Sequence, residues 1–168
     1  MTAAAPVLIV AGHEPDVFTR CVEMHMAFYA PAYGFGQAFE AVVAGGLAAF
    51  GPRMHKPCNR LWRAVQDSRI VGTIAIDGED LGSGLAHLRW FIVADSVRGT
   101  GVGKSLLSSA LDFCDLHGFA ETHLWTFSGL DAARRLYEAH GFVLQEERSG
   151  TQWGKEVLEQ RFARRSQS

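Results

Sequence analysis

A glycine-rich segment in the middle of the chain constrains the fold more than any other feature. It reads Arg98-Gly-Thr-Gly-Val-Gly-Lys-Ser105, and it lies between an apolar, strand-like stretch and a stretch with helical spacing. The backbone N–H groups at a helix start have no partner within the helix, and the helix dipole favours negative charge there. Because glycines leave these groups uncovered, the segment predicts a strand–loop–helix unit that binds phosphate.

Two common phosphate-binding motifs do not fit this loop. A P-loop requires G-x-x-x-x-G-K-[ST], and Arg98 stands where its first glycine is needed, although Gly103-Lys104-Ser105 supplies its end. The dinucleotide fingerprint G-x-G-x-x-G fails because the glycines here are spaced G-x-G-x-G. A nucleoside triphosphatase therefore remains a minor alternative, which nucleotide binding by calorimetry would test.

Hydrophobic periodicity predicts a mixed α/β chain around the loop. Seven segments read as strands, and they span Val7–Ala11, Leu61–Gln66, Ile70–Ile76, Leu85–Val93, Thr122–Phe127, Phe142–Glu147 and Val157–Phe162. Four segments read as helices, and they span Glu14–Tyr29, Gln37–Phe50, Val102–His117 and Ser128–His140. The order β-α-α-β-β-β-α-β-α-β-β predicts one domain over residues 1–168, with a mostly antiparallel, twisted mixed sheet and about four flanking helices.

Two local signals set helix ends in this prediction. Pro31 is expected to end the first helix, because the residue before a proline avoids the helical region. Ser128 and Asp131 have the spacing of a capping box, so we expect the last helix to begin at Ser128.

Composition limits the possible functions. The 168 residues are 48% hydrophobic and 20% charged, with a formal net charge of −2, which gives no general attraction to nucleic acid or an anionic membrane. No apolar run reaches the roughly 18 residues of a membrane span, and Ala3–Ala11 lacks the basic start of a signal peptide. Neither Cys21, Cys58 and Cys114 nor the seven histidines have metal-ligand spacing. We therefore expect no metal site and a reducing, cytoplasmic setting.

Two motifs together resemble a known superfamily. Arg98-x-x-Gly101-x-Gly103 matches the pattern [QR]-x-x-G-x-[GA], with which the GNAT superfamily of acyl-CoA N-acyltransferases binds the pyrophosphate of coenzyme A. The segment Ala132–Phe142 is similar to the last helix of that superfamily. The resemblance is strong over residues 60–145. Within the superfamily, the sequence is more similar to acetyltransferase domains found fused to MarR-type regulators.

The resemblance implies an enzyme and a reaction. It indicates an N-acetyltransferase that transfers the acetyl group of acetyl-CoA to a primary amine by direct attack, without a metal. The acceptor would be a small-molecule amine or a peptide amine, and a homodimer is an expected state because dimers are common in the superfamily. A catalytically silent CoA-binding module, used for sensing or interaction, is the alternative.

The resemblance also assigns the cofactor site. The cofactor would lie where the strand 85–93 diverges from the strand 122–127. The pantetheine arm would follow the first strand, and the glycine loop would hold the pyrophosphate. The cofactor-binding positions are Phe91, Ile92, Val93, Arg98, Gly99, Thr100, Gly101, Val102, Gly103 and Lys104.

Catalytic and acceptor-binding positions follow in the same way. Tyr137 matches the general-acid tyrosine of the superfamily. His87 is the candidate base, because an imidazole titrates near neutral pH and some members carry a glutamate base on this strand. Glu121, His123 and a water relay are rivals. The first two helices, their loop and the last hairpin would build the acceptor site, with the aromatic candidates Tyr29, Tyr33, Phe35, Trp90, Trp125 and Trp153.

Overall fold

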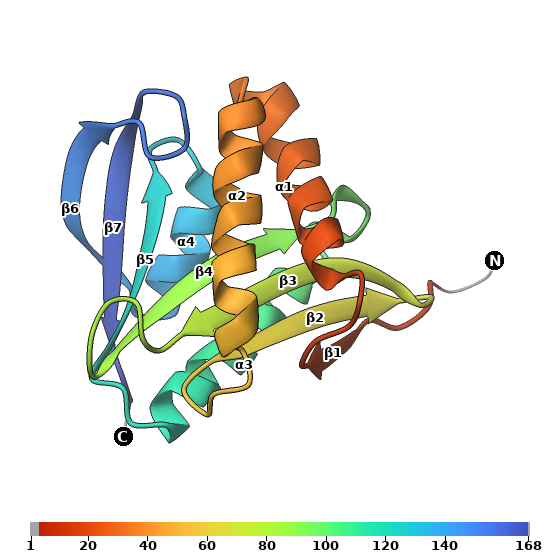
Figure 1. The fold of residues 1–168 in the computed structure, drawn as a ribbon, viewed down its shortest axis with the longest axis horizontal. Helices are drawn as coiled ribbons and strands as arrows, with labels where there is room; N and C mark the ends of the chain where they lie inside the picture. Colours follow the sequence, from red (N-terminus) through yellow and green to blue (C-terminus); the bar gives the residue numbers. More distant parts are fainter. Residues whose placement is uncertain (1–3, 168) are drawn as a thin grey trace.

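The computed structural model describes residues 4–167 and contains seven strands and four helices (Figure 1). The strands are β1 (Leu8–Ala11), β2 (Arg60–Gln66), β3 (Arg69–Asp77), β4 (Leu85–Val93), β5 (Glu121–Phe127), β6 (Val143–Gly150) and β7 (Val157–Arg165). The helices are α1 (Val17–Tyr33), α2 (Gln37–Phe50), α3 (Val102–Leu116) and α4 (Asp131–Ala139), and two 3-10 turns are η1 (Gly51–Arg53) and η2 (Asp95–Val97). The predicted fold class and element order are confirmed. No helix within residues 4–167 is both long and apolar enough to cross a membrane.

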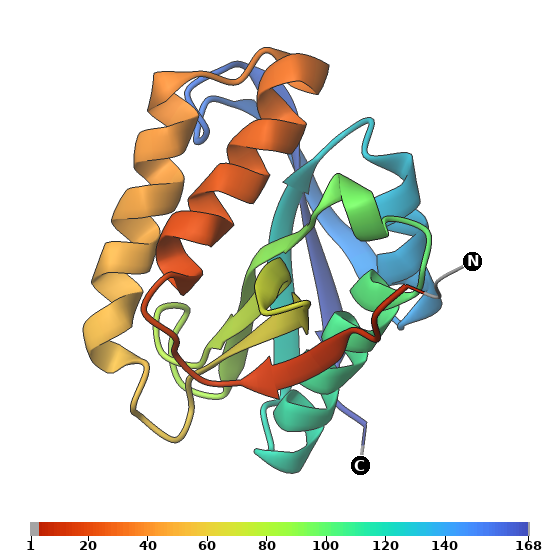
Figure 2. The same ribbon diagram turned by 90° about the vertical axis from the view of Figure 1, so that its right-hand side faces the viewer.

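One twisted sheet divides the molecule into three layers. Its strand order is β1-β2-β3-β4-β5-β7-β6, and every neighbouring pair is antiparallel except β4 and β5. Helices α1 and α2 cover one face, while α3 and α4 cover the other (Figure 2). Each face has its own apolar core: Leu106 and Phe162 are fully buried on the α3 face, and Leu47 and Phe50 are buried under α1 and α2.

The sheet opens between β4 and β5. These parallel strands pair only where Leu85–His87 lies beside Glu121–His123, and no pairing continues beyond His87 and His123 in the described structure. The second half of β4 is therefore free of a neighbour on its β5 side. This divergence was predicted, and it creates a wedge in the middle of the molecule.

A bulge in β4 changes which face its side chains occupy. Trp90 and Phe91 together oppose the single Ile74 of β3, and Trp90 has a φ of +49°, which is unusual for a bulky residue. The Thr73 hydroxyl donates a 2.8 Å hydrogen bond to the Trp90 carbonyl. Before the bulge Leu88 faces α3, whereas Trp90 joins the core under α2.

The first helix differs from the prediction at both ends. It continues through Pro31 to Tyr33 and ends at Gly34, which has a φ of +70° and donates its N–H to the Ala30 carbonyl at 2.9 Å. Pro31 removes one hydrogen bond in the last turns, and the packing of the tyrosines on this helix outweighs that loss. Glu14 precedes the helix and pairs with Arg63 at 2.8 Å.

The capping box predicted for the last helix is wrong. Helix α4 begins at Asp131, and Leu130 at its N-cap makes no side-chain hydrogen bond. The N–H of Ser128 donates to the Leu158 carbonyl at 2.9 Å, so this residue continues the pairing of β5 with β7. Sheet pairing therefore delays the helix start by three residues.

The last hairpin is longer than its apolar pattern predicts. Strand β6 extends to Gly150 and β7 to Arg165. Charged side chains pair across the polar end of β6, where Arg148 Nε lies 3.5 Å from Glu159 Oε1 of β7. Cross-strand charge pairs support a strand where hydrophobic alternation has stopped.

Candidate active site

The glycine loop has the geometry of an anion site. Gly99 and Gly101 have φ values of +75° and +91°, which favour glycine, and nothing lies within 4 Å of a Cβ built at either position. The Ser105 N–H makes the first hydrogen bond of α3, to the Gly101 carbonyl at 3.0 Å. The N–H groups of Val102, Gly103 and Lys104 therefore have no acceptor within the helix and can hold a phosphate.

The loop borders a cavity of about 500 Å³, which we call the cofactor cavity. Its walls come from α1, β4, the glycine loop and α4. The predicted positions that line it are Phe91, Ile92, Val93, Arg98, Gly99 and Gly103. The remaining loop residues lie outside its wall: Thr100 bonds the Val97 carbonyl through its hydroxyl, the Val102 side chain is buried in the core, and Gly101 and Lys104 are exposed.

The free side of β4 offers backbone groups to this cavity. The Ala94 N–H donates to the Val71 carbonyl at 2.8 Å, so it faces β3. Because backbone groups alternate in direction along a strand, those of Phe91 and Val93 point the opposite way, where β5 has diverged. An extended chain such as pantetheine could pair with them as an added strand would.

A second cavity of about 190 Å³, which we call the acceptor cavity, lies under α1 and α2. Tyr29, Trp90 and Trp125 line it, as do His87 and Trp153. Tyr33 lines the cofactor cavity instead, and Phe35 is buried in the core, so these two expected acceptor contacts lie elsewhere.

Sequence reasoning missed four polar residues of the acceptor cavity, His25, Arg89, Thr126 and Gln152. His25 lies on the buried face of α1, four residues before Tyr29, and this helical spacing was a usable signal. Arg89 lies beside Trp90 under α2: a Cβ at Gly46 would be 2.9 Å from Arg89 Nη2 and 3.0 Å from Trp90 Cζ2. The bulge places these two neighbours against the same helix, which strict alternation does not predict.

The two cavities meet at four shared residues, Tyr29, Phe91, Thr126 and Tyr137. Only 7% of Tyr137 is exposed, and burial raises its pKa well above the ordinary value. Its hydroxyl therefore carries its proton at neutral pH, and Tyr137 lies where the two cavities join.

His87 is held in an orientation that suits a proton acceptor. Its Nδ1 lies 2.8 Å from Asp80 Oδ2, and since the carboxylate accepts, Nδ1 carries the hydrogen. The lone pair of the neutral ring is then on Nε2. A carboxylate that orients an imidazole in this way is a common support for a general base.

The two rival side chains, His123 and Glu121, already have partners. Arg161 Nη1 donates to His123 Nδ1 at 3.0 Å, and His123 Nε2 lies 2.9 Å from Glu121 Oε2. Both ring nitrogens of His123 and the Glu121 carboxylate therefore have partners. His25 donates through Nδ1 to the Cys21 carbonyl at 2.7 Å, and burial lowers its pKa to about 4.

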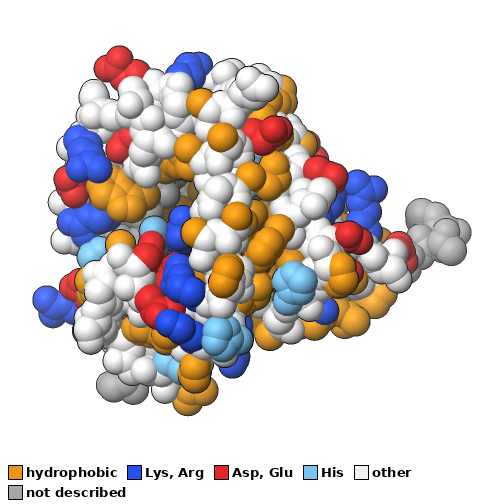
Figure 3. All heavy atoms as spheres, in the orientation of Figure 1, with side chains coloured by type: hydrophobic (Ala, Val, Ile, Leu, Met, Phe, Trp, Pro, Cys, Tyr) orange, Lys and Arg blue, Asp and Glu red, His pale blue; other side chains and the backbone are white. Residues whose placement is uncertain are grey.

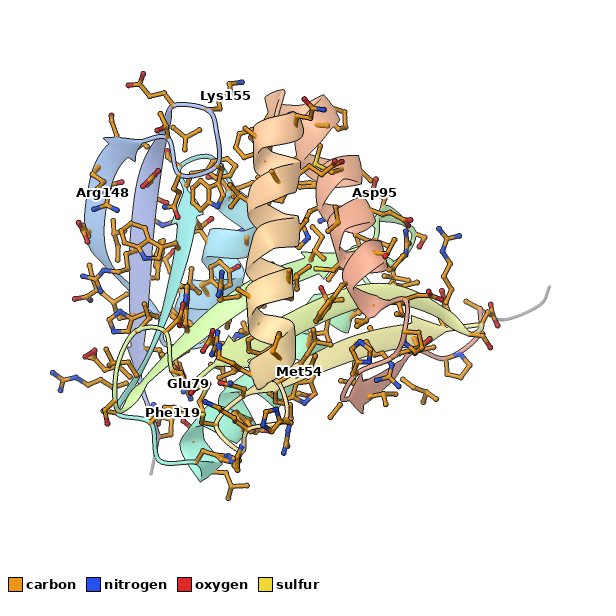
Figure 4. All side chains as sticks on the ribbon, viewed as in Figure 1. Met54, Glu79, Asp95, Phe119, Arg148 and Lys155 are labelled. Carbon is orange, nitrogen blue, oxygen red and sulfur yellow. The ribbon has the colours of Figure 1, made fainter. Side chains whose placement is uncertain are left out.

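The loop between β6 and β7 covers the acceptor cavity. Lys155, labelled in Figure 4, donates to the Tyr33 carbonyl and ties this loop to the turn between α1 and α2. Trp153 packs on Phe127 with ring centroids 5.6 Å apart. Gln152 and Trp153 thereby form part of the cavity wall.

Comparisons with known proteins show the family. The model of the acetyltransferase (GNAT) family matches residues 19–142. The N-acetylaspartate synthetase of Xenopus tropicalis is 33% identical over 89 residues, which are 53% of this chain and 32% of that protein. The chain thus spans about a third of the length of the curated relatives it matches.

Solved structures share the fold. A GNAT-family acetyltransferase from Staphylococcus aureus superimposes with a TM-score of 0.73 at 16% identity, over 96% of this chain and all of that one. A Salmonella typhimurium protein whose structure holds acetyl-CoA as its cofactor has a TM-score of 0.73 at 15% identity, over 96% of this chain and 95% of that one.

Proposed function

Because this chain belongs to the acetyltransferase (GNAT) family, we propose that it transfers the acetyl group of acetyl-CoA to the amine of a small acceptor by direct attack. The observation that carries this proposal is the meeting of two cavities at Tyr137. One cavity is bordered by the anion-binding loop, and the other contains an oriented imidazole. A thioester at the junction could be reached from the acceptor side.

The residues of the cofactor cavity fit coenzyme A. The free N–H groups at the start of α3 suit the pyrophosphate, and the β4 backbone at Phe91 and Val93 suits the pantetheine arm. Arg98 bonds Asp95 at 2.7 Å and lies over the Phe28 ring at 4.3 Å. It would exchange an exposed carboxylate for a phosphate when the cofactor binds.

The reaction requires two proton movements besides the bond exchange. Acetyl-CoA supplies a thioester, at which a C–N bond forms to the acceptor and the C–S bond breaks. His87 Nε2 would take a proton from the acceptor amine, with Asp80 holding the ring. The Tyr137 hydroxyl would give a proton to the departing sulfur, so the products are an amide and free CoA thiol.

The class of acceptor is an amino acid in this proposal. The relatives that match are named N-acetylaspartate synthetase, and the product in that name is an acetylated amino acid, aspartate. The acceptor cavity, at about 190 Å³, suits a small molecule better than a peptide chain.

The cysteines Cys21, Cys58 and Cys114 are free thiols, which supports a reducing, cytoplasmic setting.

The test is thiol release from acetyl-CoA across a panel of amines that includes amino acids. We expect release that depends on the amine, and a fall in kcat of about 10²-fold or more in Tyr137→Phe, because general acids contribute on this scale. Calorimetry of acetyl-CoA binding is the control and should give the same affinity for both proteins. Binding without release for every amine would favour the silent CoA-binding module, and absence of binding would refute the assignment of the glycine loop.

A further inference from the structure

One cation in the wall of the acceptor cavity, Arg89, is held within the described structure only by long ion pairs and by a stacking contact. Arg89 Nη1 lies 3.6 Å from Asp77 Oδ2 and 3.6 Å from Asp80 Oδ2, which is beyond a good hydrogen bond. Both carboxylates have nearer donors: Arg53 binds Asp77 at 2.7 and 3.0 Å, and His87 binds Asp80 at 2.8 Å. The guanidinium of Arg89 is thus the member of this cluster whose donors are least satisfied.

This cluster of Arg53, Asp77, Asp80, His87 and Arg89 lies where β3 and β4 pass the end of α2. Glu79, labelled in Figure 4, is close to it and binds Arg53 at 2.9 Å. Figure 3 shows acidic and basic side chains intermixed beside this end of α2. Arg89 is the arginine of the cluster that also lines the acceptor cavity.

The surroundings of Arg89 hold it in place. Its guanidinium lies 4.0 Å from the centroid of the Trp90 ring, and Gly46 of α2 leaves room for Nη2. Burial lowers the pKa of the Arg89 guanidinium, and the carboxylates of Asp80 and Asp77 oppose that shift. A fixed, partly desolvated arginine with free donors is well prepared for a planar anion, because it needs no reorganisation to bind.

We propose that Arg89 binds a carboxylate of the acceptor, and that this contact selects amino acids over other amines. The inference rests on the proposed function and adds its specificity determinant. Arg89 follows His87 by two residues on β4, so the two side chains start about 7 Å apart at the 3.3 Å rise of a strand. Asp80 Oδ2 lies between the two side chains, but both also line the acceptor cavity, so a short molecule that carries an amine and a carboxylate could contact both from there.

The experiment compares each acceptor with its uncharged amide. The probes are L-aspartate, L-alanine and L-phenylalanine, beside asparagine, alaninamide and phenylalaninamide. We expect kcat/KM to be at least about 30-fold higher for alanine and phenylalanine than for their amides, because loss of one partner of a buried charge pair has an effect of this size. Asparagine keeps the α-carboxylate of aspartate and lacks only its side-chain carboxylate. Comparing these two acceptors therefore shows which carboxylate of aspartate binds Arg89.

Two variants isolate the guanidinium. Arg89→Lys keeps the charge and loses the fork, so we expect the acid-over-amide preference to fall about 10-fold, through the KM of the acceptor and not through the KM of acetyl-CoA. Arg69→Lys, at an exposed position on β3, is the matched control and should keep the preference. Equal rates for acids and amides, or an unchanged preference in Arg89→Lys, would overturn the assignment of Arg89.

Binding measurements separate this inference from the proposed function. With CoA present, calorimetry should detect binding of the amino acids by the unsubstituted protein and weaker binding of the alanine and phenylalanine amides. That difference would uphold Arg89 as the carboxylate site even if no thiol were released, and the failure would then lie in the proposed reaction. Equal binding of acids and amides would refute the role of Arg89 whatever the turnover.

Discussion

The same substitution at two glycines of the loop should have opposite effects on stability. Gly101 has a φ of +91°, and a Cβ there would meet no atom within 4 Å, so Gly101→Ala tests backbone strain alone. Gly103 lies in the first turn of α3, and a Cβ there would lie 3.6 Å from Phe91 Cζ and 3.6 Å from Val93 Cγ2, which is ordinary contact. Gly103→Ala therefore adds packing and helix propensity without strain.

The magnitudes follow from these conformations. A non-glycine residue with left-handed backbone angles loses about 1–2 kcal/mol, whereas alanine in place of glycine inside a helix gains about 0.5–1 kcal/mol. At about 2–4 °C per kcal/mol for a chain of this size, Gly101→Ala should lower Tm by about 2–8 °C. Gly103→Ala should raise it by about 1–4 °C.

Thermal unfolding followed by circular dichroism would measure both shifts, and calorimetry would measure the affinity for acetyl-CoA. We expect Gly101→Ala to weaken acetyl-CoA binding as well, because a change in φ there moves the N–H groups of the loop, and Gly103→Ala to keep it. Shifts of the same sign in the two variants would refute this account of the loop. So would a Gly101→Ala protein with unchanged Tm and unchanged affinity.

Three further predictions test other parts of the structure. His87→Gln should lower kcat/KM by about 10²-fold, while the control His117→Gln, at the C-cap of α3, should leave it unchanged; equal effects would exclude His87 as the base. Burial lowers the pKa of His25 from 6.5 to about 4, so the unfolded chain binds a proton between these values that the folded chain does not. The free energy of unfolding should therefore fall by about 3 kcal/mol as the pH drops from 6.5 to 4. His25→Gln should remove this loss, as measured by urea titrations at both pH values. The same pH dependence in both proteins would contradict this role of His25. Arg164 donates two hydrogen bonds of 2.9 and 3.0 Å to Asp115, so Arg164→Met should lower the free energy of unfolding by about 3 kcal/mol. The double variant Arg164→Met with Asp115→Leu should recover part of that loss. Additive losses of the two single variants would refute the coupling.

Helices and strands whose apolar residues recur at regular spacing could be predicted from the sequence. The boundaries of α2 and β4 match the expected Gln37–Phe50 and Leu85–Val93, because apolar spacing continues to each end. Signals that depend on one local residue were less reliable. Pro31 lies inside α1, and Ser128 extends a strand instead of capping a helix, since packing and sheet pairing outweigh these preferences.

The acceptor cavity was harder to predict because it depends on contacts between distant segments. The bulge at Trp90 determines how Arg89 is placed, and the hydroxyl that supports the bulge belongs to Thr73, 17 residues away on β3. No spacing rule within β4 indicates such a partner. His25, by contrast, lies one helical turn from Tyr29, so helical spacing relates the two once the helix is known to face the cavity.

The two cavities differ in the kind of group that forms them, and this has a measurable consequence. The cofactor cavity offers mainly backbone N–H and carbonyl groups, at the glycine loop and along the free edge of β4, besides the guanidinium of Arg98. The acceptor cavity depends on side chains from α1, α2, β4, β5 and the β6–β7 loop, so its chemistry can change without a change of fold. Gly101→Ala should therefore weaken acetyl-CoA binding to the same extent whichever acceptor is used, whereas a substitution at Arg89 should change the order of preference among acceptors at constant affinity for acetyl-CoA. If Arg89→Lys altered both, the two sites would be coupled through the residues they share, and Tyr29 and Tyr137 would be the first places to look for that coupling.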